Sequence, residues 1–222
     1  MPPRYASEPT GPTRYGSGVS RGRIEAFSDG VFAIAITLLI LEVKVPHPGE
    51  HGLWHELARL WPSYLAFFTS FLTIGIVWIN HHAQFDRFAS VDRTLNFLNL
   101  LLLLWVSFVP FPTALVAEYL RDGNASDQHT AAMVYAATFL ALSLSFYALW
   151  RYANRASLLT HELSERQVAA LTRRNRVGHF AYAAALALAF ASAIASLVLC
   201  TLTAIYYIHP GRALPADDKP AA

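Results

Sequence analysis

Two histidines and one aspartate lie close together in the segment WINHHAQFDRF, residues 78–88. Imidazole and carboxylate side chains bind transition metals and transfer protons near neutral pH. His82 and Asp86 are four residues apart, so on a helix they would share one face, whereas His81 would point away from both. No third ligand is evident in the sequence. A metal or enzyme site is therefore an alternative hypothesis, beside a histidine pair that simply binds water and polar headgroups.

A carboxylate and an arginine stand at the start of a long apolar segment. Residues 30–41 contain one polar residue, Thr37, and follow directly after Asp29. A carboxylate inside a membrane costs a few kcal/mol unless it is paired, so Asp29 is expected to be buried against protein or to face water. Its expected partners are Arg23, about one and a half helical turns earlier, and the polar side chains around His81.

The overall composition is that of a membrane protein. Hydrophobic residues make up 55% of the 222 residues and charged residues only 14%, whereas about a quarter of the residues in an average soluble domain are charged. The charged residues cluster between long apolar runs, and a helix needs roughly 20 mostly apolar residues to cross a bilayer. The net charge of +2 gives no indication of nucleic-acid binding. The single cysteine, Cys200, excludes an intrachain disulfide.

An all-α integral membrane protein with six transmembrane helices per chain is expected. The first four helices are predicted at residues 27–45, 62–80, 95–120 and 131–150. The remaining apolar run, residues 177–208, would measure about 48 Å as one helix at 1.5 Å per residue. That length exceeds a hydrocarbon core of roughly 30 Å. We therefore predict two short helices there, with a turn near residues 192–196.

Prolines and polar ends set the other boundaries. Pro110 and Pro112 are expected to kink the far end of the third helix, because proline interrupts the backbone hydrogen bonds. The ends of the chain, residues 1–22 and 209–222, are rich in proline, glycine and polar residues and are predicted to be disordered tails. The membrane domain is therefore predicted at residues 23–208.

The positively charged residues predict the orientation. With a cytoplasmic N-terminus and six spans, 14 of the 17 Lys and Arg residues fall on the cytoplasmic side, as expected for a multi-pass protein of the cell membrane. Five spans would place fewer of them inside. Both termini are therefore predicted to be cytoplasmic. In the most basic loop, Ser164 and Gln167 have the spacing of a capping box, which predicts a short surface helix.

The first apolar helix has two different faces. At 100° per residue, Ile34, Thr37, Leu38 and Leu41 lie on one side, and Asp29 lies nearly opposite. Such an aliphatic stripe either packs against another helix or, repeated in several copies of the chain, forms the wall of a pore. In a pore, Thr37 would supply the only hydroxyl that water or an ion could contact.

The pattern R-x-x-x-F-S-D, formed by Arg23, Phe27, Ser28 and Asp29 at the start of this helix, resembles the signature of the transmembrane protein 175 family. This family comprises endolysosomal potassium channels and their prokaryotic relatives. The segment FSDGVFAIAITLLILEVKVP resembles the prokaryotic members over its whole length. The six-span pattern and the NHH sequence after the second span extend the likeness over most of the chain.

The resemblance implies a homotetramer of six-helix units without a re-entrant filter loop, in which the first helices line a central pore. It also implies that Ile34 forms the narrowest ring, that Leu38 and Leu41 form further aliphatic rings, and that Thr37 forms a polar layer. The same resemblance implies that the protein is a potassium-permeable cation channel with a hydrophobic gate. Potassium is then the permeant ion, and neither a cofactor nor an enzymatic activity is expected.

The resemblance further implies a polar network that ties the first helix to its neighbours. In this chain the residues that match the family's network positions are Arg23, Phe27, Ser28 and Asp29, with Trp78 and His81 as further partners. Two other functions remain as alternatives: a proton-coupled transporter in which Asp29 titrates, and a membrane-embedded enzyme that uses His81 and His82. The sequence shows no inverted repeat of the kind that transporters carry, and no complete set of metal ligands. The channel is therefore the leading hypothesis.

Overall fold

The computed structural model describes residues 20–46 and 52–208, and these residues are almost entirely helical. In chain order the elements are α1 (Arg21–Leu38), η1 (Leu39–Glu42), α2 (Leu53–Arg59), α3 (Trp61–Phe85), α4 (Arg93–Phe108), α5 (Pro110–Asp122), α6 (Ala125–Arg155), α7 (Glu165–Ala189) and α8 (Ala193–Tyr206). Residues 1–19 and 209–222, which include most of the predicted tails, lie outside the described residues. The helix α1 begins at Arg21, within the segment predicted as a tail.

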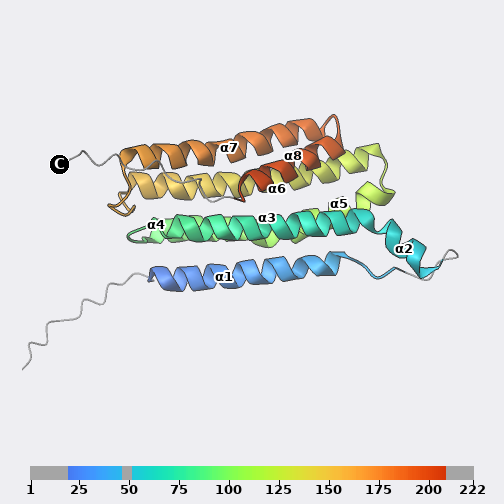
Figure 1. The fold of residues 1–222 in the computed structure, drawn as a ribbon, viewed down its shortest axis with the longest axis horizontal. Coiled ribbons are helices and arrows are strands. Elements are labelled where there is room, and N and C mark those ends of the chain that lie inside the picture. The colour runs from blue at the N-terminus through green and yellow to red at the C-terminus, as the bar shows by residue number, and fades with distance from the viewer. Residues whose placement is uncertain (1–19, 47–51, 209–222) are drawn as a thin grey trace, which may run out of the picture.

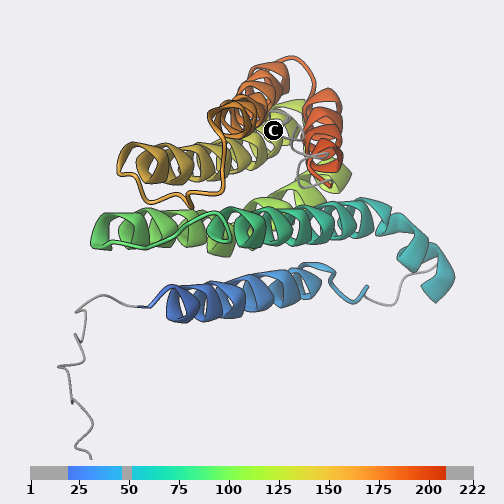
Figure 2. The same ribbon diagram turned by 60° about the vertical axis from the view of Figure 1, so that its left-hand side comes forward.

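The helices lie side by side in an elongated bundle (Figure 1). The helix α1 forms one edge of the bundle and packs on α3 and α4. The helix α6 contacts α4 and α5 on one side and α7 and α8 on the other. Figure 2 shows the same order from a second direction, with α1 separated from α7 and α8 by the other helices. One face of α1 therefore has no neighbour within the described chain.

The buried residues of α1 and η1 recur every three or four positions. They are Ile24, Ser28, Phe32, Ala35 and Leu39. This spacing places them on one face of a helix, and that face packs against α3 and α4. The aliphatic stripe that contains Ile34 lies outside this buried face.

Proline and aspartate residues set the limits of the central helices. Pro62 lies in the first turn of α3, where its missing N–H leaves no helical hydrogen bond unmade. Asp92 caps α4 by accepting a hydrogen bond from the backbone nitrogen of Leu95 at 2.7 Å. The helix is interrupted at Val109, directly before Pro110, which separates α4 from α5. This break confirms the predicted kink.

The helix α7 is longer than predicted. Ser164 and Gln167 form the predicted capping box, but the helix that begins there continues to Ala189. The prediction of a short surface helix was therefore wrong. Residues 165–189 are rich in Ala, Leu and Arg and contain no proline, so their intrinsic preference favours one continuous helix.

A single glycine lets α6, α7 and the end of α8 approach closely. A Cβ atom added to Gly178 of α7 would lie 2.8 Å from Ser143 Oγ and 2.9 Å from the hydroxyl oxygen of Tyr207. Both distances are shorter than a real side chain allows. A Cβ atom at this position would therefore force the Ser143 hydroxyl or the Tyr207 ring to shift.

The apolar run at residues 177–208 is divided into two helices, as predicted. Ser192 caps α8 by accepting a hydrogen bond from the backbone nitrogen of Ala195 at 3.2 Å. The turn occupies residues 190–192, slightly earlier than the predicted 192–196, because Ser192 is the residue that satisfies the start of α8.

By length and composition, four helical segments of the described residues could cross a membrane. They span residues 21–42, 61–85, 93–120 and 125–155. The helix α8 is apolar but has only 14 residues, and the first half of α7 carries several arginines. Length and hydropathy alone therefore support four crossings rather than the predicted six.

Candidate pore-lining face and its anchor

The predicted pore-lining residues lie on the face of α1 and η1 that has no neighbour within the described part of the chain. Ile34 is 62% exposed, Leu38 42% and Leu41 69%. On the opposite side of the helix, Phe32 and Leu39 are at most 3% exposed. Large apolar side chains gathered on one outer face mark a surface that contacts lipid or another protein. This face is therefore available to lipid or to further copies of the chain.

Thr37 lies on the same exposed face. Its hydroxyl is 2.9 Å from the backbone oxygens of both Ala33 and Ile34, to which it donates its proton. A hydroxyl keeps acceptor lone pairs when its proton is used in this way. Thr37 therefore presents an oxygen to water or to a cation on the outer side of α1.

The carboxylate of Asp29 is bound by α3. The indole Nε1 of Trp78 donates a hydrogen bond to Asp29 Oδ1 at 2.8 Å. The hydrogen bonds expected with Arg23 or His81 are not formed. Arg23 is exposed, and its separation of six helical residues from Asp29 leaves the two side chains about 120° apart. The Nε2 atom of His81 binds Asn99 instead. Asp29 is also exposed within one chain, whereas burial was expected.

A buried set of hydrogen bonds joins α1, α3 and α4. Asn99 Nδ2 donates to Ser28 Oγ at 3.0 Å, and Ser28 Oγ donates to the backbone oxygen of Ile24 at 2.8 Å. The amide oxygen of Asn99 lies 2.8 Å from His81 Nε2. Because that oxygen can only accept, the Nε2 atom carries the proton. Ser28 and Asn99 are completely buried, so these bonds hold α1 in one rotation on the bundle.

Sequence reasoning missed Asn99. It lies in the apolar segment LNFLNLLLLL of the third predicted span, and an amide inside such a segment is a signal for a hydrogen bond between helices. Its partner Ser28 lies 71 positions away in the sequence. The sequence pattern could have indicated that Asn99 has a partner, but not which residue it is.

The two adjacent histidines point in different directions. His81 is buried, and its ring stacks on Phe85 with 4.5 Å between the centroids. His82 is exposed, and its Nε2 atom lies 3.8 Å from Asp86 Oδ2. Residues 20–46 and 52–208 contain no group of three His, Cys, Asp or Glu residues placed to hold a metal ion.

Arg21 makes the kind of ionic contact that was expected of Arg23. Its guanidinium binds Asp86 at 2.8 Å and Glu25 at 3.1 Å, and it donates to the backbone oxygen of Phe88 at 3.2 Å. These contacts tie the start of α1 to the segment that follows α3. The i, i+4 spacing of Arg21 and Glu25 could have predicted their ion pair from the sequence. Arg21, however, lies in the segment that was predicted to be a disordered tail.

Comparison with known proteins shows the family. The model of the family "Endosomal/lysosomal potassium channel TMEM175" matches residues 23–110. A potassium channel of Streptomyces collinus is 52% identical over 188 residues, which cover 84% of this chain and 90% of that channel. The chain belongs to the TMEM175 family. The matched residues 23–110 include the aliphatic face of α1 and every residue of the buried hydrogen-bond set.

Solved structures agree with this membership. A lysosomal potassium-selective channel TMEM175 homolog from Chamaesiphon minutus is 47% identical, with a TM-score of 0.74, and the match covers 84% of this chain and 95% of that chain. A variant of the potassium channel MtTMEM175, solved with a nanobody–MBP fusion, is 22% identical, with a TM-score of 0.61 over 92% of this chain and 96% of that chain. The second likeness shows the TMEM175 fold alone. Both proteins are named as channels and not as enzymes.

Proposed function

We propose that this TMEM175 family member is a potassium-permeable cation channel of the cell membrane, formed by four copies of the chain around the α1 helices. The observation that carries the proposal is the aliphatic face of α1, which is exposed in a helix long and apolar enough to cross a membrane. The names of its relatives as potassium channels support the same function.

A single chain cannot enclose a path for ions with one helix face. Closed rotational symmetry repeats the same face around an axis, so each exposed residue of α1 becomes a ring. In this arrangement Ile34, Leu38 and Leu41 form aliphatic rings, and Thr37 forms a polar layer between the first two. A helix at the edge of its own chain, as α1 is (Figure 1), can reach such an axis.

The ring of Ile34 is the constriction in this proposal. Its wall offers no polar atom, so an ion that passes must give up part of its hydration without receiving ligands in return. Narrow hydrophobic rings of this kind gate by losing their water. Thr37, whose oxygen is free to accept, supplies a contact for the ion one helical turn away.

The hydrogen bonds of α1 orient this face. Ser28, Asn99 and His81 fix the rotation of α1 from the buried side, and Trp78 binds Asp29 beside them. A rotation of α1 by one residue would turn the aliphatic face by about 100° away from the axis. We therefore assign these residues a positioning role and no contact with the ion.

We also propose that α7 and α8 form the fifth and sixth crossings. Large apolar side chains are exposed on both helices and in the turn between them: Phe180, Phe190, Ile194, Val198 and Leu202. In lipid such residues face hydrocarbon, whereas in water they would form an unstable patch. Six crossings return the C-terminus to the cytoplasmic side and agree with the distribution of Lys and Arg residues.

Cation flux into liposomes that contain the purified full-length protein tests this function. We expect potassium flux down its gradient in vesicles without any pH difference. A proton-coupled transporter would require a coupled movement of protons, and a membrane enzyme would give no flux. Folded, reconstituted protein that carries no potassium current would contradict the proposal.

A further inference from the structure

The outer face of α7 is basic in its first half and apolar beyond it. Its exposed arginines are Arg166, Arg173 and Arg176, and the exposed apolar residues Val177 and Phe180 follow them. At 100° per residue, the other four side chains lie within about 60° of Arg173. Residues 177–208 contain no Asp, Glu, Lys or Arg. The charge on this face therefore ends abruptly at Arg176.

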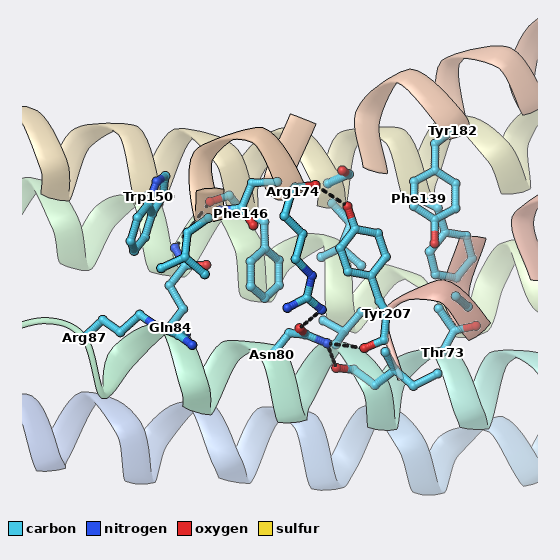
Figure 3. A pocket seen from close by; sticks show the side chains of 17 residues that line it. Thr73, Asn80, Gln84, Arg87, Phe139, Phe146, Trp150, Arg174, Tyr182 and Tyr207 are labelled. Atoms are coloured by element: carbon cyan, nitrogen blue, oxygen red, sulfur yellow. Dashed lines mark hydrogen bonds between the residues drawn. The ribbon is translucent and has the colours of Figure 1, made fainter. Parts of the chain in front are cut away.

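Contacts between helices give the depth of this transition in the bundle. Arg174 Nη2 donates to Asn80 Oδ1 of α3 at 3.2 Å, and Asn80 Nδ2 donates to the backbone oxygen of Tyr207 at 3.0 Å. The Tyr207 hydroxyl donates to the backbone oxygen of Arg174 at 2.8 Å, which completes a closed set on the wall of the cavity between α3, α6, α7 and α8 (Figure 3). Arg173 and Arg176 are at most two residues from Arg174, so they lie within about 3 Å of its level along the helix axis.

Exposed tryptophans on α3 show where this level lies in the membrane. Trp78 is two residues from Asn80, Trp61 lies at the other end of α3, and both are exposed. A rise of 1.5 Å per residue puts about 26 Å between them, close to a hydrocarbon core of roughly 30 Å. The exposed residues between them are apolar and include Leu65, Phe68 and Leu72. Because tryptophan is enriched at both membrane interfaces, Arg173 and Arg176 lie at the depth of the lipid headgroups.

Within the described residues, neither of these two arginines pairs with an acidic side chain. The salt bridges of this part of the chain involve Arg21, Lys44 and His82 as the basic partners. The nearest acidic residue on α7, Glu165, precedes Arg173 by about 12 Å along the helix, which exceeds the Debye length of about 8 Å at physiological ionic strength. A phosphate group accepts charge-assisted hydrogen bonds from a guanidinium group. The face therefore fits a ligand with a negative headgroup and a hydrocarbon chain.

We propose that the outer face of α7 binds anionic phospholipids of the cytoplasmic leaflet. Arg173 and Arg176 contact the phosphate groups, and Val177 and Phe180 contact the acyl chains. This proposal rests on the proposed function, which places α7 in the membrane with its first residues on the cytoplasmic side. Arginines next to the membrane attract the anionic lipids of that leaflet. Because α1 is separated from α7 by other helices (Figure 2), lipid can reach this face without entering the pore.

A fluorescent label on the same face measures which lipids gather there. The labelled protein is full-length Ala184→Cys, one turn beyond Phe180 and exposed, with a bimane group on the new cysteine. The native Cys200 is buried. In mixed vesicles of phosphatidylcholine and phosphatidylglycerol, brominated acyl chains on one lipid at a time quench the label in proportion to that lipid's occupancy. We expect phosphatidylglycerol to be favoured by about tenfold or more, since each arginine near an anionic surface contributes a factor of about five.

The possible outcomes separate the lipid surface from the channel. A label that brominated phosphatidylcholine does not quench would place α7 outside the bilayer and would overturn its proposed crossing as well. Equal affinity for the two lipids would overturn the anionic preference alone. Inorganic phosphate at constant ionic strength should displace no lipid, and displacement would assign the arginines to a soluble anion. Potassium flux in vesicles of phosphatidylcholine alone tests the channel independently.

Substitutions locate the bound lipid. Arg173→Gln and Arg176→Gln should each lower the preference for phosphatidylglycerol by about fivefold, and the double change should remove most of it. Lysine at both positions keeps the charge and should retain the preference. The matched control is Arg166→Gln, on the same face but about 10 Å before Arg173, outside the headgroup layer, which should keep nearly the whole preference. A double Gln variant with the lipid preference of the unchanged protein would refute the surface.

Discussion

Asn99 is the residue on which the placement of α1 most depends. Its amide group donates to Ser28 of α1 and accepts from His81 of α3, and all three side chains are buried. A buried polar group that loses its partner pays its full desolvation cost, which is larger than the net value of the bond. Substitutions of Asn99 should therefore lower the stability of the folded protein.

Asn99→Leu removes both hydrogen bonds while keeping a similar side-chain volume. We expect a loss of about 1–3 kcal/mol in stability, because His81 Nε2 is left buried without an acceptor. Thermal unfolding in detergent measures the loss. Asn96→Leu, on the same helix and half-buried, is the control and should change the melting temperature little. Equal melting temperatures for both variants would contradict the role of Asn99.

Ile34 is the residue at which flux should be most sensitive. Ile34→Ala widens the proposed ring and should raise the flux by about tenfold, which corresponds to about 1.4 kcal/mol of barrier. Ile34→Asn keeps water in the ring and should weaken the discrimination between potassium and sodium. Thr37→Val, which removes the polar layer, should have a milder effect. The measurement is current per folded assembly, with both cations compared.

Ile40→Asn is the control for Ile34→Asn. Ile40 is also exposed, but the helical projection places it on another face of the helix. It should lower the amount of folded protein without changing the current of each assembly. If Ile34→Asn behaves in the same way, the constriction lies elsewhere, and Leu38 and Leu41 are the next positions to test.

The helices α6, α7 and α8 approach one another closely at Gly178. Gly178 brings α7 against Ser143 of α6 and the Tyr207 hydroxyl after α8. The same tyrosine belongs to the closed set around Arg174. A side chain at position 178 would therefore displace the Ser143 hydroxyl or the Tyr207 ring at the contact between these helices.

Gly178→Ala should destabilise this helix group by about 1–3 kcal/mol, because the added methyl group overpacks the contact. Gly75→Ala in α3 is the control, since a Cβ atom there meets nothing within 4 Å. That change should be neutral or stabilising, as alanine favours a helix by up to about 1 kcal/mol over glycine. The two melting temperatures should therefore shift in opposite directions. A Gly178→Ala variant as stable as Gly75→Ala would show that the helices can move apart freely.

At the scale of the whole molecule, one chain presents two unlike surfaces. The helix α1 carries an aliphatic face at one edge of the bundle, and α7 and α8 carry exposed apolar residues on the opposite side (Figure 2). We assign the first surface to contacts around the pore axis and the second to lipid. The chain is then one wedge of a ring, which closes only when several copies assemble.

The mass of the protein particle tests this assignment. We expect a detergent-solubilised particle with four times the chain mass of 24.6 kDa, measured by light scattering after correction for detergent. Leu41→Glu would place like charges together near the axis and should reduce the proportion of this particle, because unpaired charges in an apolar interface are costly. A protein mass of one chain under conditions that preserve flux would exclude the ring.

The sequence by itself determined the features that depend on neighbouring residues. The apolar runs predicted helices in a membrane, Pro110 marked the break before α5, and Ser164 with Gln167 marked the start of α7. The periodicity of α1 placed Ile34, Thr37 and Leu38 on one face of the helix, and the signature at residues 23–29 indicated the family. Each of these signals is contained within a few turns of one helix.

Only the tertiary structure decided which helix faces meet. It showed that Ser28 is bound to Asn99, that Trp78 rather than Arg23 binds Asp29, and that four helices enclose a cavity with two arginines. These partners are distant in the sequence, and helical periodicity is the same for every possible pairing of faces. The choice among pairings depends on how the side chains of several helices fill space together, which no single segment records.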